Sequence, residues 1–279
     1  MPMFIRIVLI IAVLLGLLLA AGWAGFQVKA SSFALVPFSS APSKVAIPAD
    51  LPEPVERFAR AVFGEELPEV SSAMVLGRAQ LAPTGMPMPA RFRFYYDAAR
   101  SSHYHEIQVT WFNLPFMRIH ERNLEGHVML DLSLLGKVED QPKTNRAGIQ
   151  GYWSEVLAWV PSIALTDPRL RWETVDAATA RLHLPGLDAE EAFTVRFDPQ
   201  TGLISEIETQ RYQDEARPER WRWFNRILEW GVVDGMRVPV RSQTQWNDAE
   251  PWATWEVEQV ILNADVSARL AQFGGDLAQ

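Results

Sequence analysis

The sequence predicts a mainly β protein, a curved antiparallel half-barrel of about ten to twelve strands with helices over its concave face and an N-terminal transmembrane helix. Polar and apolar residues alternate over 70–135 and again over 169–262, as in half-exposed strands. Two stretches, 51–63 and 148–160, instead carry apolar residues at helical spacing, and one long uncharged run lies near the N-terminus. Twist curls so many antiparallel strands and creates a concave face for the helices.

The uncharged run from Ile7 to Phe26 follows a lone Arg6. It makes about 30 Å of helix, the thickness of a bilayer's hydrocarbon core, and Trp23 stands where an interfacial aromatic would hold it. We expect residues 1–29 to be a single-pass anchor in the cell inner membrane. The rest of the chain is then extracytoplasmic, because Arg6 is the only charge on the N-terminal side. The alternative is a signal peptide cleaved near Gly22-Trp23-Ala24, which leaves a periplasmic protein.

Small residues recur at every fourth position of this run and form a ridge that permits self-association of helices. They are Ala12, Gly16, Ala20 and Ala24. Residues 30–50, rich in Ser, Pro and Ala, are expected to be a linker, followed by one half-barrel domain over 51–279.

Composition excludes several function classes. The chain has no cysteine, so disulfides, thiolate catalysis and thiolate zinc sites are excluded. From residue 30 onward it holds 24 Lys and Arg against 34 Asp and Glu, a net charge of −10. Such a surface argues against nucleic acid and anionic headgroups as partners.

The first helix of the domain is predicted over 51–63. Asp50 is the expected cap, Glu53 is its capping-box partner, and Gly64 ends the helix. Its core-facing side carries Val55, Phe58 and Val62.

In the strands that follow, Phe92, Phe94 and Tyr96 share one face, opposite Arg91, Arg93 and Tyr95. Ile107, Val109 and Trp111 alternate with polar neighbours in the next strand.

The helix predicted over 148–160 carries an unbroken apolar stripe that ends at Pro161. Trp159 falls off the stripe, so we expect it at the lip of a pocket or contact surface. The expected ligand-binding residues are Trp159, Trp153, Tyr152 and Trp172.

Seven further strands are predicted between 169 and 262 by the same alternation, with hairpin turns at Asp198–Gly202 and Asp234-Gly235. A short tail helix follows, capped by Asp265, with Val266, Leu270 and Phe273 on one side.

Five segments together resemble a bacterial family of unknown function, DUF6544. They are LPEPVERFARAVFG (51–64), GYWSEVLAWVPSIAL (151–165), RWETVD (171–176), FDPQTGLISEIETQRY (197–212) and DGMRVPVRSQTQW (234–246). The resemblance covers most of 50–262 and is weakest over 80–115. It implies a curved antiparallel sheet similar to the LolA/LolB lipoprotein carriers, and it carries over no catalytic residues.

Candidate chemistry is sparse. The chain has no nucleophile elbow, no zinc-protease helix motif, no P-loop and no dinucleotide turn. His103 and His105 point the same way in a strand, as a metal pair requires, and His120 and His127 lie on neighbouring strands. Solvated or hydrogen-bonded histidines are the favoured interpretation, so we expect no metal and no cofactor. A second hypothesis, acid/base hydrolysis, would use Glu155, Glu173 and Asp176.

The sequence therefore favours a non-enzymatic, membrane-tethered, extracytoplasmic domain that binds or carries a lipid or another apolar ligand. The first alternative is a structural or assembly partner of another envelope protein, which would use the same concave face. The second is the acid/base hydrolase.

Overall fold

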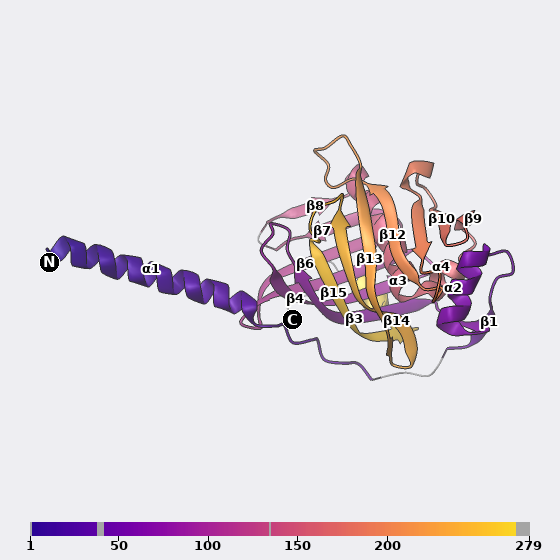
Figure 1. Cartoon of the computed structure of the whole chain (residues 1–279), viewed down its shortest axis with the longest axis horizontal. Coiled ribbons are helices and arrows are strands. Elements are labelled where there is room, and N and C mark those ends of the chain that lie inside the picture. The colour runs from indigo at the N-terminus through magenta and orange to yellow at the C-terminus, as the bar shows by residue number, and fades with distance from the viewer. Residues whose placement is uncertain (1, 38–41, 134, 272–279) are drawn as a thin grey trace.

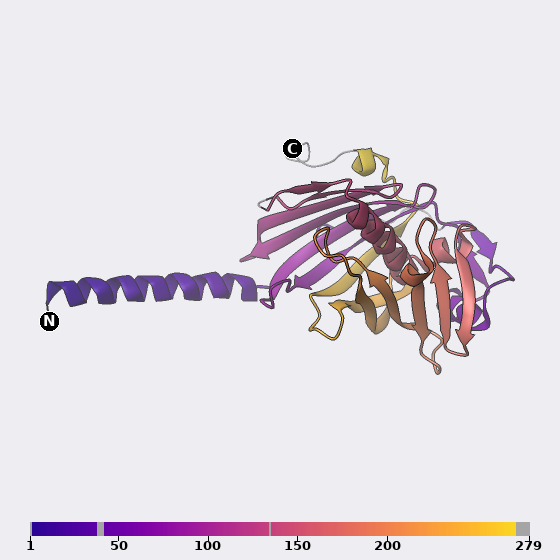
Figure 2. The same ribbon diagram turned by 90° about the horizontal axis from the view of Figure 1, so that it is seen from above.

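The computed structural model describes residues 2–37, 42–133 and 135–271. Within them, one antiparallel sheet of thirteen strands curls around a central helix, and a long helix projects from one edge (Figures 1 and 2). The sheet order is β8-β7-β6-β5-β4-β3-β15-β14-β13-β12-β11-β10-β9. Every pair of neighbouring strands in this sheet is consecutive in sequence except β3 and β15, which join the two halves, and the consecutive strands β8 and β9 form its two edges.

The predicted mainly β half-barrel is confirmed, and the sheet exceeds the expected strand count because short edge strands carry little alternation. The strands of the large sheet are β3 (Ser72–Leu81), β4 (Met88–Asp97), β5 (Ser102–Trp111), β6 (Leu114–Leu124), β7 (His127–Asp131), β8 (Lys137–Glu139), β9 (Arg171–Asp176), β10 (Thr179–His183), β11 (Phe193–Phe197), β12 (Ile204–Arg211), β13 (Trp221–Val233), β14 (Met236–Trp246) and β15 (Ala253–Leu262). The expected linker contains β1 (Lys44–Ala46), which pairs with β2 (Glu66–Pro68).

Bulges and one glycine curve the sheet at its centre. The register of β15 on β3 shifts between Val257 and Gln259. A Cβ on Gly77 would lie 2.0 Å from the Glu256 carbonyl oxygen, so only glycine allows this close backbone approach.

Helix α3 (Pro142–Trp159) runs inside the curve of the sheet, followed by α4 (Pro161–Thr166) (Figure 2). It begins six residues before the predicted start at 148, because its first turns are polar and carry no apolar stripe. Glu215 caps this polar start by accepting a hydrogen bond from the Thr144 backbone N–H at 2.6 Å.

The expectation that Trp159 lies outside the core is wrong. Its side chain is 3% exposed and packs against Phe92, Phe94 and Trp255, with ring centroids 5.9, 5.9 and 6.4 Å away. The sheet curls far enough to cover the flank of α3 as well as its apolar stripe, so the position off the stripe is also buried.

Helix α2 (Glu53–Phe63) begins later than expected, with Pro52 at its N-cap and no side-chain cap, so the predicted Asp50 capping box is wrong. Glu53 instead accepts a hydrogen bond from Arg57 at 2.5 Å. Gly64 ends the helix as predicted, with a φ of 81°.

The tail helix α5 (Ser267–Ala271) also matches the prediction, since Asp265 accepts hydrogen bonds from Ser267 and Leu270 is buried. Phe273 lies outside the described residues.

The projecting helix α1 (Met3–Gln27) is long and apolar enough to cross a membrane, and a signal sequence passes the same test. Its C-terminal end sits on the domain at Trp111. The Trp111 indole N–H donates a hydrogen bond to the Gly22 carbonyl oxygen at 3.0 Å. The Phe112 backbone N–H donates one to the Gly25 carbonyl oxygen at 2.9 Å. A Cβ on Gly25 would lie 2.0 Å from the indole nitrogen, so the joint requires glycine.

Candidate functional site

A cluster of ionisable side chains lies inside the curved sheet, where α3 faces β5 and β6. Alternation places His103 and His105 on one face of β5. The strand register sets Glu121 of β6 opposite His105 and Tyr96 of β4 opposite His103. Glu155 of α3 completes the cluster, whose side chains therefore come from β4, β5, β6 and the central helix.

The polar atoms of this cluster are in direct contact. His103 Nε2 lies 3.0 Å from Glu121 Oε1, and His105 Nε2 lies 2.9 Å from Glu155 Oε2. The two imidazole rings stack with centroids 4.1 Å apart and planes 7° apart. The Tyr96 hydroxyl donates a hydrogen bond to Glu155 Oε2 at 2.9 Å.

Burial and charge act in opposite directions on these groups. Burial lowers the pKa of His103, and the neighbouring His105 lowers it further. Burial also lowers the pKa of His105, but the charge of Glu155, its contact with the ring and the charge of Glu121 together outweigh burial, so that pKa is raised. Burial raises the pKa of Glu121, but the hydrogen bond with His103 and the charge of His105 outweigh it and lower that pKa to about 2. The cluster therefore favours ionised Glu121 beside a neutral His103.

Arg211 brings a positive charge to the same region from β12, on the opposite half of the sheet. Its guanidinium carbon lies over the Trp223 ring, 5.0 Å from the centroid. Burial lowers the pKa of Arg211, while the charges of Glu121 and Glu155 oppose that shift. The cluster therefore joins the two halves of the sheet electrostatically.

A cavity of about 440 Å³ lies next to this cluster. Tyr152 separates the two, because it lines the cavity and stacks parallel to His103 with ring centroids 6.2 Å apart. The Trp153 side chain also lines the cavity, and Arg169 lies over its ring at 5.8 Å. The lining further includes Ala99, Arg100, Ser101, Glu125, Gly126 and Ile149.

Two of the four predicted ligand-binding residues line this cavity. Tyr152 and Trp153 form its wall, although both belong to the core and are 0% and 1% exposed. Trp159 is deep in the aromatic core, and Trp172 lies on edge strand β9, packed against the core. Neither of these two is part of the cavity lining.

The structure brings only part of the predicted histidine group together. His120 turns to the other face of the sheet and accepts or donates a hydrogen bond with Tyr104 at 2.7 Å, while His127 is exposed and pairs with Asp140. His103 and His105 are buried rather than solvated. Their acidic partner Glu121 lies beside them because the turn at Phe112–Asn113 sets the register of β6 on β5.

The three acids of the hydrolase hypothesis do not meet. Glu155 is in the cluster, whereas Glu173 and Asp176 lie on the exposed strand β9. The Glu173 carboxylate contacts His183 at 2.9 Å.

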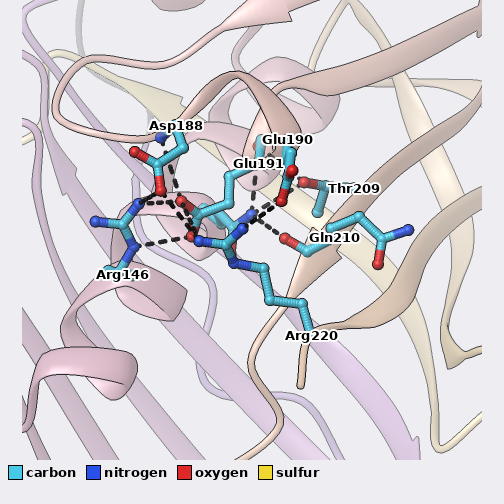
Figure 3. A network of polar contacts seen from close by, with 8 residues as sticks. Arg146, Asp188, Glu190, Glu191, Thr209, Gln210 and Arg220 are labelled. Atoms are coloured by element: carbon cyan, nitrogen blue, oxygen red, sulfur yellow. Dashed lines mark hydrogen bonds and ion pairs between the residues drawn. The ribbon is translucent and has the colours of Figure 1, made fainter. Parts of the chain in front are cut away.

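A second polar network holds the first half of α3 (Figure 3). Its centre is the fully buried Glu191 carboxylate, which pairs with Arg146 of α3 and with Arg220. Asp188 accepts from both arginines, at 2.8 and 3.0 Å. The Glu191 carbonyl oxygen accepts from the Thr209 hydroxyl at 2.8 Å. These contacts tie α3 to β12 and so hold the helix in place across the curve of the sheet.

Comparison with known proteins identifies the family of this chain. A model described as "Family of unknown function (DUF6544)" matches residues 41–257. The chain belongs to this family. No curated protein matches the sequence.

Solved structures with a similar fold are distant in sequence. A DUF1329 family protein from Desulfovibrio piger shares 9% identity at a TM-score of 0.48, covering 81% of this chain and 96% of that one. A LolA superfamily protein from Nitrosomonas europaea shares 11% at 0.43, covering 79% and 96%. A putative outer membrane lipoprotein-sorting protein domain from Vibrio parahaemolyticus shares 8% at 0.46, covering 77% and 92%.

Proposed function

We propose that this DUF6544 protein is a membrane-tethered, extracytoplasmic domain that binds a lipid or another apolar ligand in the cavity beside Tyr152 and Trp153. The observation that supports the proposal most directly is the cavity itself. Its volume of about 440 Å³ is within the range of small-molecule sites, roughly 300–1,000 Å³. Ala99, Ile149 and Pro185 offer apolar contact above the buried rings of Tyr152 and Trp153. Arg100 and Arg169 line the same cavity and can contact a polar end of the ligand.

Burial of apolar surface is expected to provide the affinity. Both arginines already have carboxylate partners, Arg100 with Asp97 at 2.8 Å and Arg169 with Asp167 at 2.5 Å. Their charge is therefore largely balanced before a ligand arrives. Binding should depend on acyl or ring burial and respond weakly to salt.

A matched pair of variants tests the site with a fluorescent fatty-acyl probe and the full chain in detergent. Ala99→Trp fills the cavity from its exposed rim and should weaken probe binding by about tenfold or more, which is roughly 1.4 kcal/mol. Ser205→Trp places the same side chain in a separate groove of about 640 Å³ and should leave affinity unchanged. Loss of binding in Ser205→Trp alone would move the site to that groove, and no binding by the wild type would end the proposal.

We also propose that α1 is retained as the membrane anchor. The contact of Gly22 with the domain supports this, since cleavage near Gly22-Trp23-Ala24 would remove it. N-terminal sequencing of the mature protein from the membrane fraction tests it. A mature N-terminus near Gly25 contradicts it.

The second candidate function is a structural or assembly partner of another envelope protein. It is favoured by the separate groove, where Leu228 is 46% exposed and Val232 is 68% exposed. In-cell crosslinking from position 232 distinguishes the two functions. Reproducible capture of one envelope protein, together with no binding of the acyl probe, favours the assembly function.

A further inference from the structure

The buried histidine and glutamate cluster has the composition and spacing of a metal site. One donor atom from each of His103, His105 and Glu121 lies within 4.8 Å of the other two. Glu155 lies beside this three-residue group, with its Oε2 2.9 Å from His105 Nε2, and is not part of it. Two imidazoles and one carboxylate form a donor set that suits zinc and similar first-row divalent ions.

Unsatisfied polar atoms indicate that internal hydrogen bonds do not account for this cluster. His105 is 7% exposed in its side chain, and its Nε2 contacts the Glu155 oxygen at 2.9 Å without the alignment of a hydrogen bond. His103 Nδ1 is also buried without a hydrogen-bond partner. Buried polar atoms are nearly always satisfied, so these two nitrogens require an explanation. A cation between His105 and Glu121 accounts for the His105 Nε2 atom.

The spacing lets the three donors reach one ion after a modest movement. Bonds of about 2.0–2.1 Å in a tetrahedron separate the donor atoms by roughly 3.3 Å. His103 Nε2 and Glu121 Oε1 are 3.0 Å apart, close to that value, and the three donor atoms lie within 4.8 Å of one another. The His105 ring would turn out of its stack on His103 to bring its nitrogen to the ion. We propose that His103, His105 and Glu121 bind one divalent transition-metal ion, with Zn²⁺ the best match.

The surroundings are suited to hold these ligands in place. The Tyr96 hydroxyl orients Glu155, the neighbour of His105, through its hydrogen bond. Phe94 stacks on the His105 ring with centroids 3.8 Å apart, and Tyr152 stacks parallel to His103. Since Tyr152 also lines the cavity, the ion would stiffen the wall of the proposed ligand site. The metal proposal does not depend on that ligand.

Metal binding to the full chain, purified in detergent without a histidine tag and treated with chelator, tests the proposal. Isothermal titration with Zn²⁺ should give one ion per chain. Glu121→Gln preserves side-chain shape and should weaken binding by more than about 100-fold, because even changes outside the ligand shell cost roughly 10–100-fold. His127→Gln, at an exposed histidine paired with Asp140, is the matched control and should bind as the wild type does.

A second measurement addresses folding of the variants. Zn²⁺ should raise the melting temperature of the wild type and of His127→Gln, and it should not raise that of a folded Glu121→Gln protein. Co²⁺ should give the visible absorption of a four-coordinate ion in the wild type, which requires no variant at all. The proposal is overturned if the wild type takes up no stoichiometric Zn²⁺ or Co²⁺, or if Glu121→Gln and His105→Gln bind as tightly as the wild type.

Discussion

Replacing Trp159 by Ala should be among the most destabilising single changes in the domain. The indole is 3% exposed and lies between Phe92, Phe94 and Trp255. A buried Trp removes roughly 150–250 Å² from water, and at about 25 cal/mol per Å² this is about 4–6 kcal/mol. Measured truncations of buried aromatics cost about 3–5 kcal/mol, which is the value we expect.

Trp159→Phe separates packing from polarity at the same position. The Trp159 indole N–H is buried without a hydrogen-bond partner, and such a group costs about 1–3 kcal/mol. Phenylalanine removes that cost while it keeps most of the ring contacts, so it should destabilise far less than alanine does.

Urea unfolding of the full chain in mild detergent, followed by near-ultraviolet circular dichroism, provides the assay. Trp153→Ala is the reference, because Trp153 is 1% exposed and should lose a similar free energy of unfolding. A loss below about 1 kcal/mol for Trp159→Ala, beside a full loss for Trp153→Ala, would refute the core position of Trp159.

Three further changes test other parts of the structure. Glu191→Ala leaves two arginines without their central buried partner and should cost about 3 kcal/mol in urea unfolding, whereas an unchanged midpoint would show that the network is dispensable. Gly25→Val clashes with Trp111 and should break the contact between the end of α1 and the domain. Limited proteolysis over 26–37 should then be faster than in the wild type, and equal cleavage rates would contradict this contact. Burial raises the pKa of Glu208, but hydrogen bonds from Arg222 and Arg196 outweigh it and lower that pKa. The stability lost in Glu208→Gln should therefore be largest above the ordinary carboxyl pKa and vanish as the pH falls through the lowered one; a difference that grows in acid contradicts this.

Much of the architecture follows from local patterns. Alternation predicted the strands because most of them bury one face, and Phe92, Phe94 and Tyr96 do point into the core. Strand β5, which the sequence predicted to be half-exposed, is instead buried on both faces. The hairpin at Asp234-Gly235 follows from turn chemistry. Patterns failed where long-range packing decides, as for Trp159, whose burial depends on how far the sheet curls.

The candidate site shows the same division. Side chains alternate between the two faces of a strand, which predicted that His103 and His105 share one face. In the structure the two rings stack on each other. Their burial was not predictable, because it requires α3 to lie across β5 and to bring Glu155 to within 2.9 Å of His105. The sequence interpretation also named Arg211 as an ion-pair partner for Glu155, Glu173 or Asp176, and in the structure the charges of Glu121 and Glu155 act on Arg211.

Photocrosslinking in cells with a diazirine fatty-acyl probe, followed by mass-spectrometric mapping of the adducts, tests whether an apolar ligand occupies the cavity beside Tyr152 and Trp153. Adducts are expected on the segments that line the cavity, 99–101, 149–153 and 185–186, and they should be lost in Ala99→Trp. Adducts confined to α1 or to the groove at Leu228 and Val232 would contradict it.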